Sequence, residues 1–143
     1  MNNLVKLVRK IGLISLFSVM PLAAQITYCV KFTTPFAFYV GETQMPSGSY
    51  FLTQPNDLND SIAEVKSADG LHSALIGVTP TQSLDPPRQS KIIFEKYGDT
   101  VYFNRVDLRG DPYGIVADPT KAGRKAEERA SVVEERSVTV AGQ

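Results

Sequence analysis

The sequence predicts an all-β fold, a small antiparallel β-barrel or sandwich built from hairpins, followed by a C-terminal helix. Three observations predict it. Apolar and polar residues alternate over short segments, as they do in half-buried strands. Two pairs of such segments are separated by Asp69-Gly70 and by Gly98-Asp99, dipeptides typical of tight hairpin turns. A charged, alanine-containing segment follows Asp118-Pro119, which is a favourable helix start.

The N-terminus has the organisation of a signal peptide. A basic region is followed by the apolar run Ile11 to Met20 and by small residues that end at Ala24. The apolar run is shorter than the roughly 20 residues that span a bilayer, so we expect cleavage after Ala24 and export to the periplasm or beyond, not a retained anchor. The prediction divides the chain into a signal peptide (1–24), an antiparallel β domain (25–118) and a helical, partly disordered C-terminal tail (119–143).

Composition and charge limit the function. The predicted cleavage removes Lys6, Arg9 and Lys10 from a chain with 15 basic and 15 acidic residues, which leaves a mature charge of about −3. Nucleic-acid binding needs clustered basic residues, so we do not expect it. Cys29 is the only cysteine, which excludes an intramolecular disulfide. We expect its thiol to be buried and inert, the alternative being an intermolecular bridge.

The first strands are rich in aromatic residues. A strand from Ile26 to Thr33 ends at Pro35, which removes a backbone donor. Phe36, Phe38 and Val40 then share one side of an extended segment. Turns are expected at Gly41-Glu42 and at Pro46-Ser47-Gly48, before Tyr50 and Leu52 resume the alternation.

The loop that follows is the one place with a cluster of oxygen ligands. Asp57, Asn59 and Asp60 lie close together there. The glycine and the later glutamate of a twelve-residue calcium loop are missing. We therefore expect a structural loop and no metal site.

Two predicted hairpins supply many of the residues expected in the core. A two-residue loop at Asp69-Gly70 predicts an inward face of four residues, namely Ala63, Val65, Ala74 and Ile76. The Gly98-Asp99 turn predicts that Phe94 pairs with Phe103 and Ile92 with Arg105. The proline-containing segment Thr79 to Ser90 between the hairpins predicts a long connection.

A helix is expected from Lys121 to Arg136, with Asp118 as its cap and Pro119 at its first position. Its apolar stripe is thin, made of Ala122, Ala126, Ala130 and Val133. So small a stripe buries little, so the prediction is that residues from about Thr120 onward can be removed without unfolding the domain. The final residues, 137–143, are expected to fray.

The chain resembles a family of small exported all-β proteins, found chiefly in acidobacteria, to which no activity is assigned. The resemblance lies in Phe32 to Gly41, Met45 to Tyr50, Phe94 to Asp99 with Tyr102-Phe103, and the charged segment Arg124 to Arg129. It implies export and an all-β fold and nothing about activity. The sequence departs from the family pattern in its longer, more alanine-rich C-terminal part and in the absence of the usual Trp in the strand ending at Leu108.

The expected function is that of a non-enzymatic binding or structural module of the bacterial cell envelope, with a protein partner at the C-terminal helix as one route of interaction. The alternative is a small barrel that binds an apolar molecule among its inward rings, which are Phe36, Phe38, Phe94 and Phe103. No catalytic motif, cofactor motif or metal-ligand pattern is recognisable. The single histidine, His72, has no nucleophile or acid at a catalytic spacing, so we expect a hydrogen-bonded residue at the rim of a hairpin.

Overall fold

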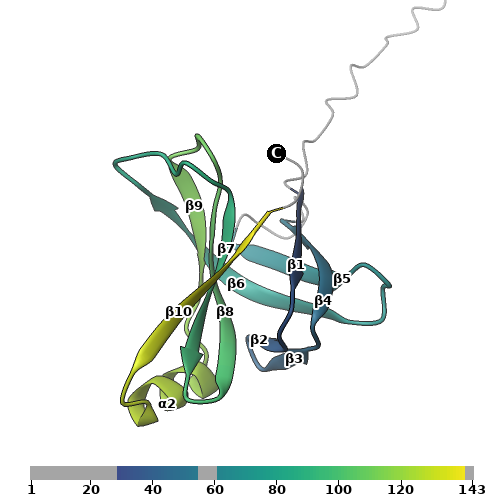
Figure 1. Cartoon of the computed structure of the whole chain (residues 1–143), viewed down its shortest axis with the longest axis vertical. Coiled ribbons are helices and arrows are strands. Elements are labelled where there is room, and N and C mark those ends of the chain that lie inside the picture. Colours follow the sequence, from purple (N-terminus) through teal and green to yellow (C-terminus); the bar gives the residue numbers. More distant parts are fainter. Residues whose placement is uncertain (1–28, 55–60, 141–143) are drawn as a thin grey trace, which may run out of the picture.

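The computed structural model describes residues 29–54 and 61–140, and this part of the chain forms strands with one short helix (Figure 1). The predicted all-β class with a C-terminal helix is confirmed. The elements are β1 (Cys29–Thr34), β2 (Phe38–Val40), β3 (Thr43–Met45), β4 (Gly48–Thr53), β5 (Ile62–Ser67), β6 (Ser73–Gln82), β7 (Lys91–Tyr97), β8 (Thr100–Asp107), β9 (Tyr113–Ala117), α2 (Lys121–Arg129) and β10 (Val133–Thr139). The predicted signal peptide and the Asp57, Asn59 and Asp60 loop lie outside the described residues.

The strands form one strongly curved sheet in the order β1-β4-β5-β6-β9-β8-β2-β3, with β7 on β8 and β10 on β7. All pairings are antiparallel except that of β2 with β8. Phe32 of β1 forms a single isolated bridge with Val140, the residue that follows β10. The sheet is therefore not closed into a barrel, and the two arms of the sheet that diverge from β6 are visible in Figure 1.

The long strand β6 joins the two arms because it changes partner along its length. Residues 73–77 pair with β5, and residues 78–82 pair with β9. The prediction of a connection starting at Thr79 is thus wrong by four residues. Residues 78–82 pair only with β9. The Val78 N–H points away from β9, to the Ser61 carbonyl, and Pro80 two residues later faces the same way, so its missing N–H removes no ladder bond.

Aromatic rings fill the interior. Phe32, Phe38, Tyr50 and Phe94 are at most 1% exposed. The Phe94 ring centroid lies 5.1 Å from that of Phe38 and 6.3 Å from that of Phe103. The inward face predicted for the Asp69-Gly70 hairpin is also buried and has the predicted register, with Val65 opposite Ala74 and Ala63 opposite Ile76. These rings and aliphatic side chains form one continuous core.

The second hairpin has the predicted register only near its turn. Phe94 pairs with Phe103, as expected, but Ile92 pairs with Val106 and not with Arg105. The cause is a β-bulge, in which Asn104 is an extra residue on β8 that has no partner on β7. The bulge turns Val106 into the core opposite Ile92 and places Arg105 outside, where its Nε lies 3.2 Å from Asp107 Oδ1.

The C-terminal prediction is wrong in two respects. The helix ends at Arg129, and residues 133–139 form strand β10 along β7. Val140, just beyond β10, is buried in the core. Arg136 on β10 lies over the Phe36 ring, with its guanidinium carbon 5.6 Å from the ring centroid. The tail therefore contributes to the sheet, because β7 supplies the pairing that a short strand needs.

The prediction of a buried Cys29 is also wrong, because the thiol is exposed. In β1 the inward positions are Val30 and Phe32, and Cys29 falls on the opposite face by the period of two. Elsewhere, no helix in the described part of the chain has the length and apolar composition needed to cross a membrane.

We expect the exposed thiol to be dispensable for stability. Cys29→Ser should change the free energy of unfolding by less than about 0.5 kcal/mol, as for other exposed substitutions. A thiol reagent should also label the folded wild-type protein at the rate of a free cysteine. A cost of several kcal/mol in urea denaturation, or labelling only in denaturant, would mean that the thiol is packed in solution.

Candidate functional site

The sheet splits at the point where β8 changes its neighbour. Arg105 and Val106 of β8 pair with β9, whereas Tyr102 pairs with Tyr39 of β2. Between these two pairings lie Phe103 and the bulged Asn104. Since β7 occupies the other edge of β8, β9 and β2 lie on the same edge, and the end of β9 and the end of β2 approach this gap from opposite directions. The helix α2 lies at this end of the molecule (Figure 1).

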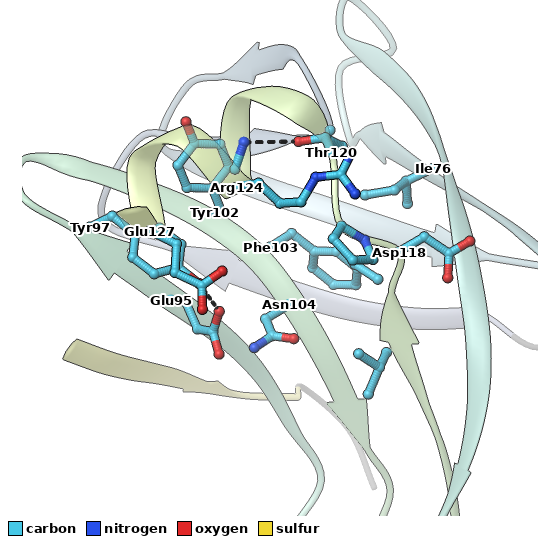
Figure 2. Close-up of a pocket in the computed structure, with 15 residues that line it drawn as sticks. Ile76, Glu95, Tyr97, Tyr102, Phe103, Asn104, Asp118, Thr120, Arg124 and Glu127 are labelled. Atoms are coloured by element: carbon cyan, nitrogen blue, oxygen red, sulfur yellow. Dashed lines mark hydrogen bonds between the residues drawn. The ribbon is translucent and has the colours of Figure 1, made fainter. Parts of the chain in front are cut away.

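A pocket of about 270 Å³ lies at this split (Figure 2). It is lined by side chains from β6, β7 and β8, by the chain from Val116 to Thr120, by Gly41 of the β2–β3 turn, and by one side of α2. Phe103 and Ile76, which also belong to the core, are part of its apolar lining. The pocket thus extends from the surface of the sheet to the edge of the hydrophobic core.

Three polar side chains gather at one end of the pocket. Figure 2 shows Glu95, Tyr97 and Glu127 together there. The Tyr97 hydroxyl donates a hydrogen bond to Glu95 Oε2. Burial of the phenol raises the pKa of Tyr97, and the Glu95 hydrogen bond and the negative charges of Glu95 and Glu127 raise it further. This end of the pocket therefore holds two carboxylates beside a protonated phenol.

Tyrosine rings continue this end of the pocket along the outer surface of the sheet. The ring centroid of Tyr102 lies 5.8 Å from that of Tyr97 and 5.5 Å from that of Tyr39. All three side chains are half-buried. Burial raises the pKa of Tyr102, with a smaller contribution from Tyr39. The phenols of Tyr97 and Tyr102 therefore stay neutral near pH 7, and their ring faces are available for stacking or cation–π contacts.

The other end of the pocket is formed by the connection from β9 to α2. Asp118, expected to cap the helix, instead accepts a hydrogen bond from Thr79 Oγ1 at 2.7 Å, and its N–H donates to the Gly77 carbonyl at 2.8 Å. A Cβ at Gly77 would lie 2.5 Å from Asp118 Oδ2, so a larger residue there would displace the Asp118 side chain. Asp118 thus fastens the connection to β6.

Thr120 is the residue that caps α2. Its Oγ1 accepts a hydrogen bond from the Gly123 N–H at 3.1 Å, so the cap lies two residues later than predicted, while the predicted helix start at Lys121 is confirmed. Arg124 extends from the first turn of α2 along the pocket, and Glu127 follows it on the next turn (Figure 2). The helix therefore supplies one positive and one negative side chain to the pocket.

Loss of this cap should loosen the helix over the pocket. We expect Thr120→Ala to lower the free energy of unfolding by about 1 kcal/mol, the usual effect of losing a threonine cap. Thr120→Ser keeps the hydroxyl and should cost clearly less. Urea denaturation followed by circular dichroism measures both, and equal losses in the two variants would show that the methyl group matters and the cap does not.

His72, the one histidine considered as a catalytic residue in the sequence, lies away from this pocket. His72 is exposed in the β5–β6 turn, beside Ser67 and Asp69. The Ser67 hydroxyl donates to Asp69 Oδ1 at 2.5 Å and accepts from the His72 backbone N–H at 2.9 Å. The hydrogen bond from the Ser67 hydroxyl holds the pKa of the Asp69 carboxyl below its usual value. Because the bonds to His72 involve its backbone, they stabilise the turn and do not activate a nucleophile.

No group of three or more histidine, cysteine or acidic residues is arranged for a metal ion among the residues that the structure describes. The sequence alone did not predict the pocket, because its lining residues come from segments that are far apart in the chain. The sequence predicts that Glu95 and Tyr97 lie on the outer face of a hairpin and that Arg124 and Glu127 lie on the solvated face of a helix. The one signal available was the tyrosine pair Tyr97 and Tyr102 on the outer side of the predicted second hairpin.

Comparisons of the chain with protein-family models, with curated proteins and with solved structures find no significant match.

Proposed function

We propose that this protein is an exported, non-enzymatic binding module of the bacterial cell envelope, and that the pocket beneath α2 is its ligand site. The observation that carries the proposal is the composition of this pocket. It combines an apolar wall with polar side chains that converge from segments far apart in the sequence, which is the usual make-up of a small-molecule site.

The packing of the core favours this pocket over a ligand in the interior. The four rings that could have lined a central cavity are in contact with one another or with their neighbours, and Phe36 meets Phe94 edge-on at 5.2 Å. An apolar molecule would have to displace these contacts. The pocket at the split offers a volume that is already formed.

The polar arrangement supports binding in preference to catalysis. The Tyr97 hydroxyl is protonated and engaged with Glu95. Phenol and carboxylate groups held in this way can orient a ligand through hydrogen bonds. Covalent catalysis by a hydroxyl would need a base beside it, and the Ser67 hydroxyl is instead hydrogen-bonded within the β5–β6 turn.

The exposed face of α2, with Lys125, Glu128 and Arg129, is where we propose that an envelope protein would bind. This proposal is independent of the pocket. Both depend on export, for which the basic and apolar N-terminal segment is the support.

A screen of small fragments by NMR tests the ligand site. Isotope-labelled protein purified from the envelope fraction should show shifts that cluster at pocket residues such as Glu95, Tyr102 and Thr120. Glu127→Trp, which puts a bulky ring on the pocket side of α2, should reduce these shifts. Glu128→Trp makes the same change at the next position, which does not line the pocket, and should leave them intact. A screen in which no amine, sugar or acid fragment shifts these residues would overturn the proposal.

Export is tested separately by the intact mass of the protein in the envelope fraction. The expected mass is that of residues 25–143. Retention of Met1 to Ala24, or recovery of the protein in the cytoplasmic fraction alone, would contradict the export part of the proposal.

A further inference from the structure

We propose that the pocket beneath α2 selects a ligand that carries an organic cation, such as a primary amine or a guanidinium group, next to an apolar or aromatic body. This inference rests on the proposed function, because it names the ligand class of the same site. It depends on the aromatic wall, the balance of charges and the position of those charges.

The aromatic wall provides a surface that a cation can use. Tyr97 and Tyr102 line the pocket with rings 5.8 Å apart, and Phe103 continues the wall toward the core. The face of an aromatic ring is negative and attracts a cation within about 6 Å of its centre. The rings also cover the apolar body that such a ligand carries.

The charges that line the pocket are mainly negative. Glu95, Asp118 and Glu127 contribute carboxylates, and Arg124 is the one basic residue among the lining side chains. The formal charge of the lining near pH 7 is therefore negative. An anionic ligand would meet repulsion from this lining, whereas a cation would be attracted.

The negative groups are also placed beside the rings. Glu95 and Glu127 lie at the end of the pocket that contains Tyr97 (Figure 2). Glu127 forms no hydrogen bond or ion pair through its carboxylate within the described residues. Its carboxylate is available to a ligand, while Glu95 has one oxygen engaged by the Tyr97 hydroxyl. A cation at this end would be in reach of both carboxylates and of a ring face.

Arg124 extends along the pocket toward its other end (Figure 2). It lies one turn before Glu127 on the same side of α2. In the absence of a ligand its charge partly offsets the negative lining. A bound cation would compete with it, so removal of the Arg124 charge should strengthen binding of a cation.

Three probes of nearly equal shape and different charge test the inference. Benzylamine, benzyl alcohol and benzoate share a ring and differ in charge, and each is small enough for a pocket of about 270 Å³. They are titrated into isotope-labelled protein purified from the envelope fraction, with shifts at Tyr102 and Thr120 as the readout. We expect benzylamine to bind more tightly than benzyl alcohol, benzoate to bind most weakly, and added salt to weaken benzylamine.

Matched variants locate the charge effect. Glu127→Gln should weaken benzylamine binding by about three- to fivefold, the effect of one exposed ion pair, and should leave benzyl alcohol unchanged. Glu128→Gln removes the same charge from the same helix but from a position outside the pocket, and should change binding by less than about twofold. Arg124→Gln should tighten benzylamine binding.

The outcomes separate this inference from the proposed function. Tighter binding of benzoate or benzyl alcohol than of benzylamine at the same residues would overturn the cation inference while keeping the pocket as a ligand site. Equal weakening by Glu127→Gln and Glu128→Gln would overturn it as well, since the effect would then be one of overall charge. No shift at pocket residues with these probes or in the wider fragment screen would overturn both.

Discussion

Removal of residues 131–143 is expected to destabilise the fold severely. The truncation deletes β10, which pairs with β7 over all seven of its residues, and it removes Val140 from the core. Burial of a side chain such as Val140 contributes about 1.5–3 kcal/mol, in a domain whose total stability is expected to be about 5–15 kcal/mol. The loss of β10 would also uncover the edge of β7, where Ile92 and Phe94 are completely buried in the intact chain.

Urea denaturation of the truncated and full chains measures this effect. Two single substitutions separate the contribution of the buried Val140 side chain from that of an exposed position on β10. Val140→Ala should cost about 1.6 kcal/mol, from the loss of two buried carbons. Glu135→Gln, at an exposed position of β10, should stay within about 0.5 kcal/mol. An unchanged denaturation midpoint after truncation would show that the β domain is stable without β10, as the sequence suggested.

Phe94→Ala is expected to cost about 3–5 kcal/mol or slightly more, the largest effect of a single substitution in this protein. The Phe94 ring is completely buried and contacts four other rings, those of Phe32, Phe36, Phe38 and Phe103. These rings belong to β1, β2, β8 and the β1–β2 connection. Loss of the Phe94 ring would leave a cavity between the two arms of the sheet, and the surrounding strands can close it only in part.

Two comparisons make this prediction specific. Phe103→Ala, at the cross-strand partner, should also cost about 3–5 kcal/mol, whereas Tyr102→Ala on the half-buried outer face should cost less. Tyr113→Ala removes an aromatic side chain that is 59% exposed and should be nearly neutral. A larger loss for Tyr102→Ala than for Phe103→Ala would show that the register of β7 and β8 is reversed in solution.

The hairpins could be predicted because their determinants are local. Gly98 has φ 61° and Gly70 has φ 76°, conformations that glycine adopts without strain. Each turn brings the adjacent segments together, and the alternation of apolar residues then decides which face is buried. The exposed position of Cys29 follows from the same alternation once β1 is known to place Val30 and Phe32 inward.

The bulge and the last strand depend on contacts between distant segments. Asn104 leaves the ladder so that Val106 and Leu108 can be buried, together with Ile92. The segment from Val133 to Thr139 has few apolar residues, although Arg136, Val138 and Val140 do alternate toward the core. A helix was the better interpretation for the isolated segment, and pairing with β7 outweighs that local preference.

By itself the sequence determined the all-β class, the two main turns and most of the inward residues, because turn chemistry and period-two burial act between near neighbours. Only the tertiary structure decided that the sheet stays open, that the chain returns as β10, and that Glu95, Tyr97, Arg124 and Glu127 share one pocket. These features arise where the neighbour of β8 changes from β9 to β2 and α2 covers the gap between those two strands. Such an arrangement requires segments as far apart as Gly41 and Glu127 to lie side by side, and no local sequence pattern predicts that proximity.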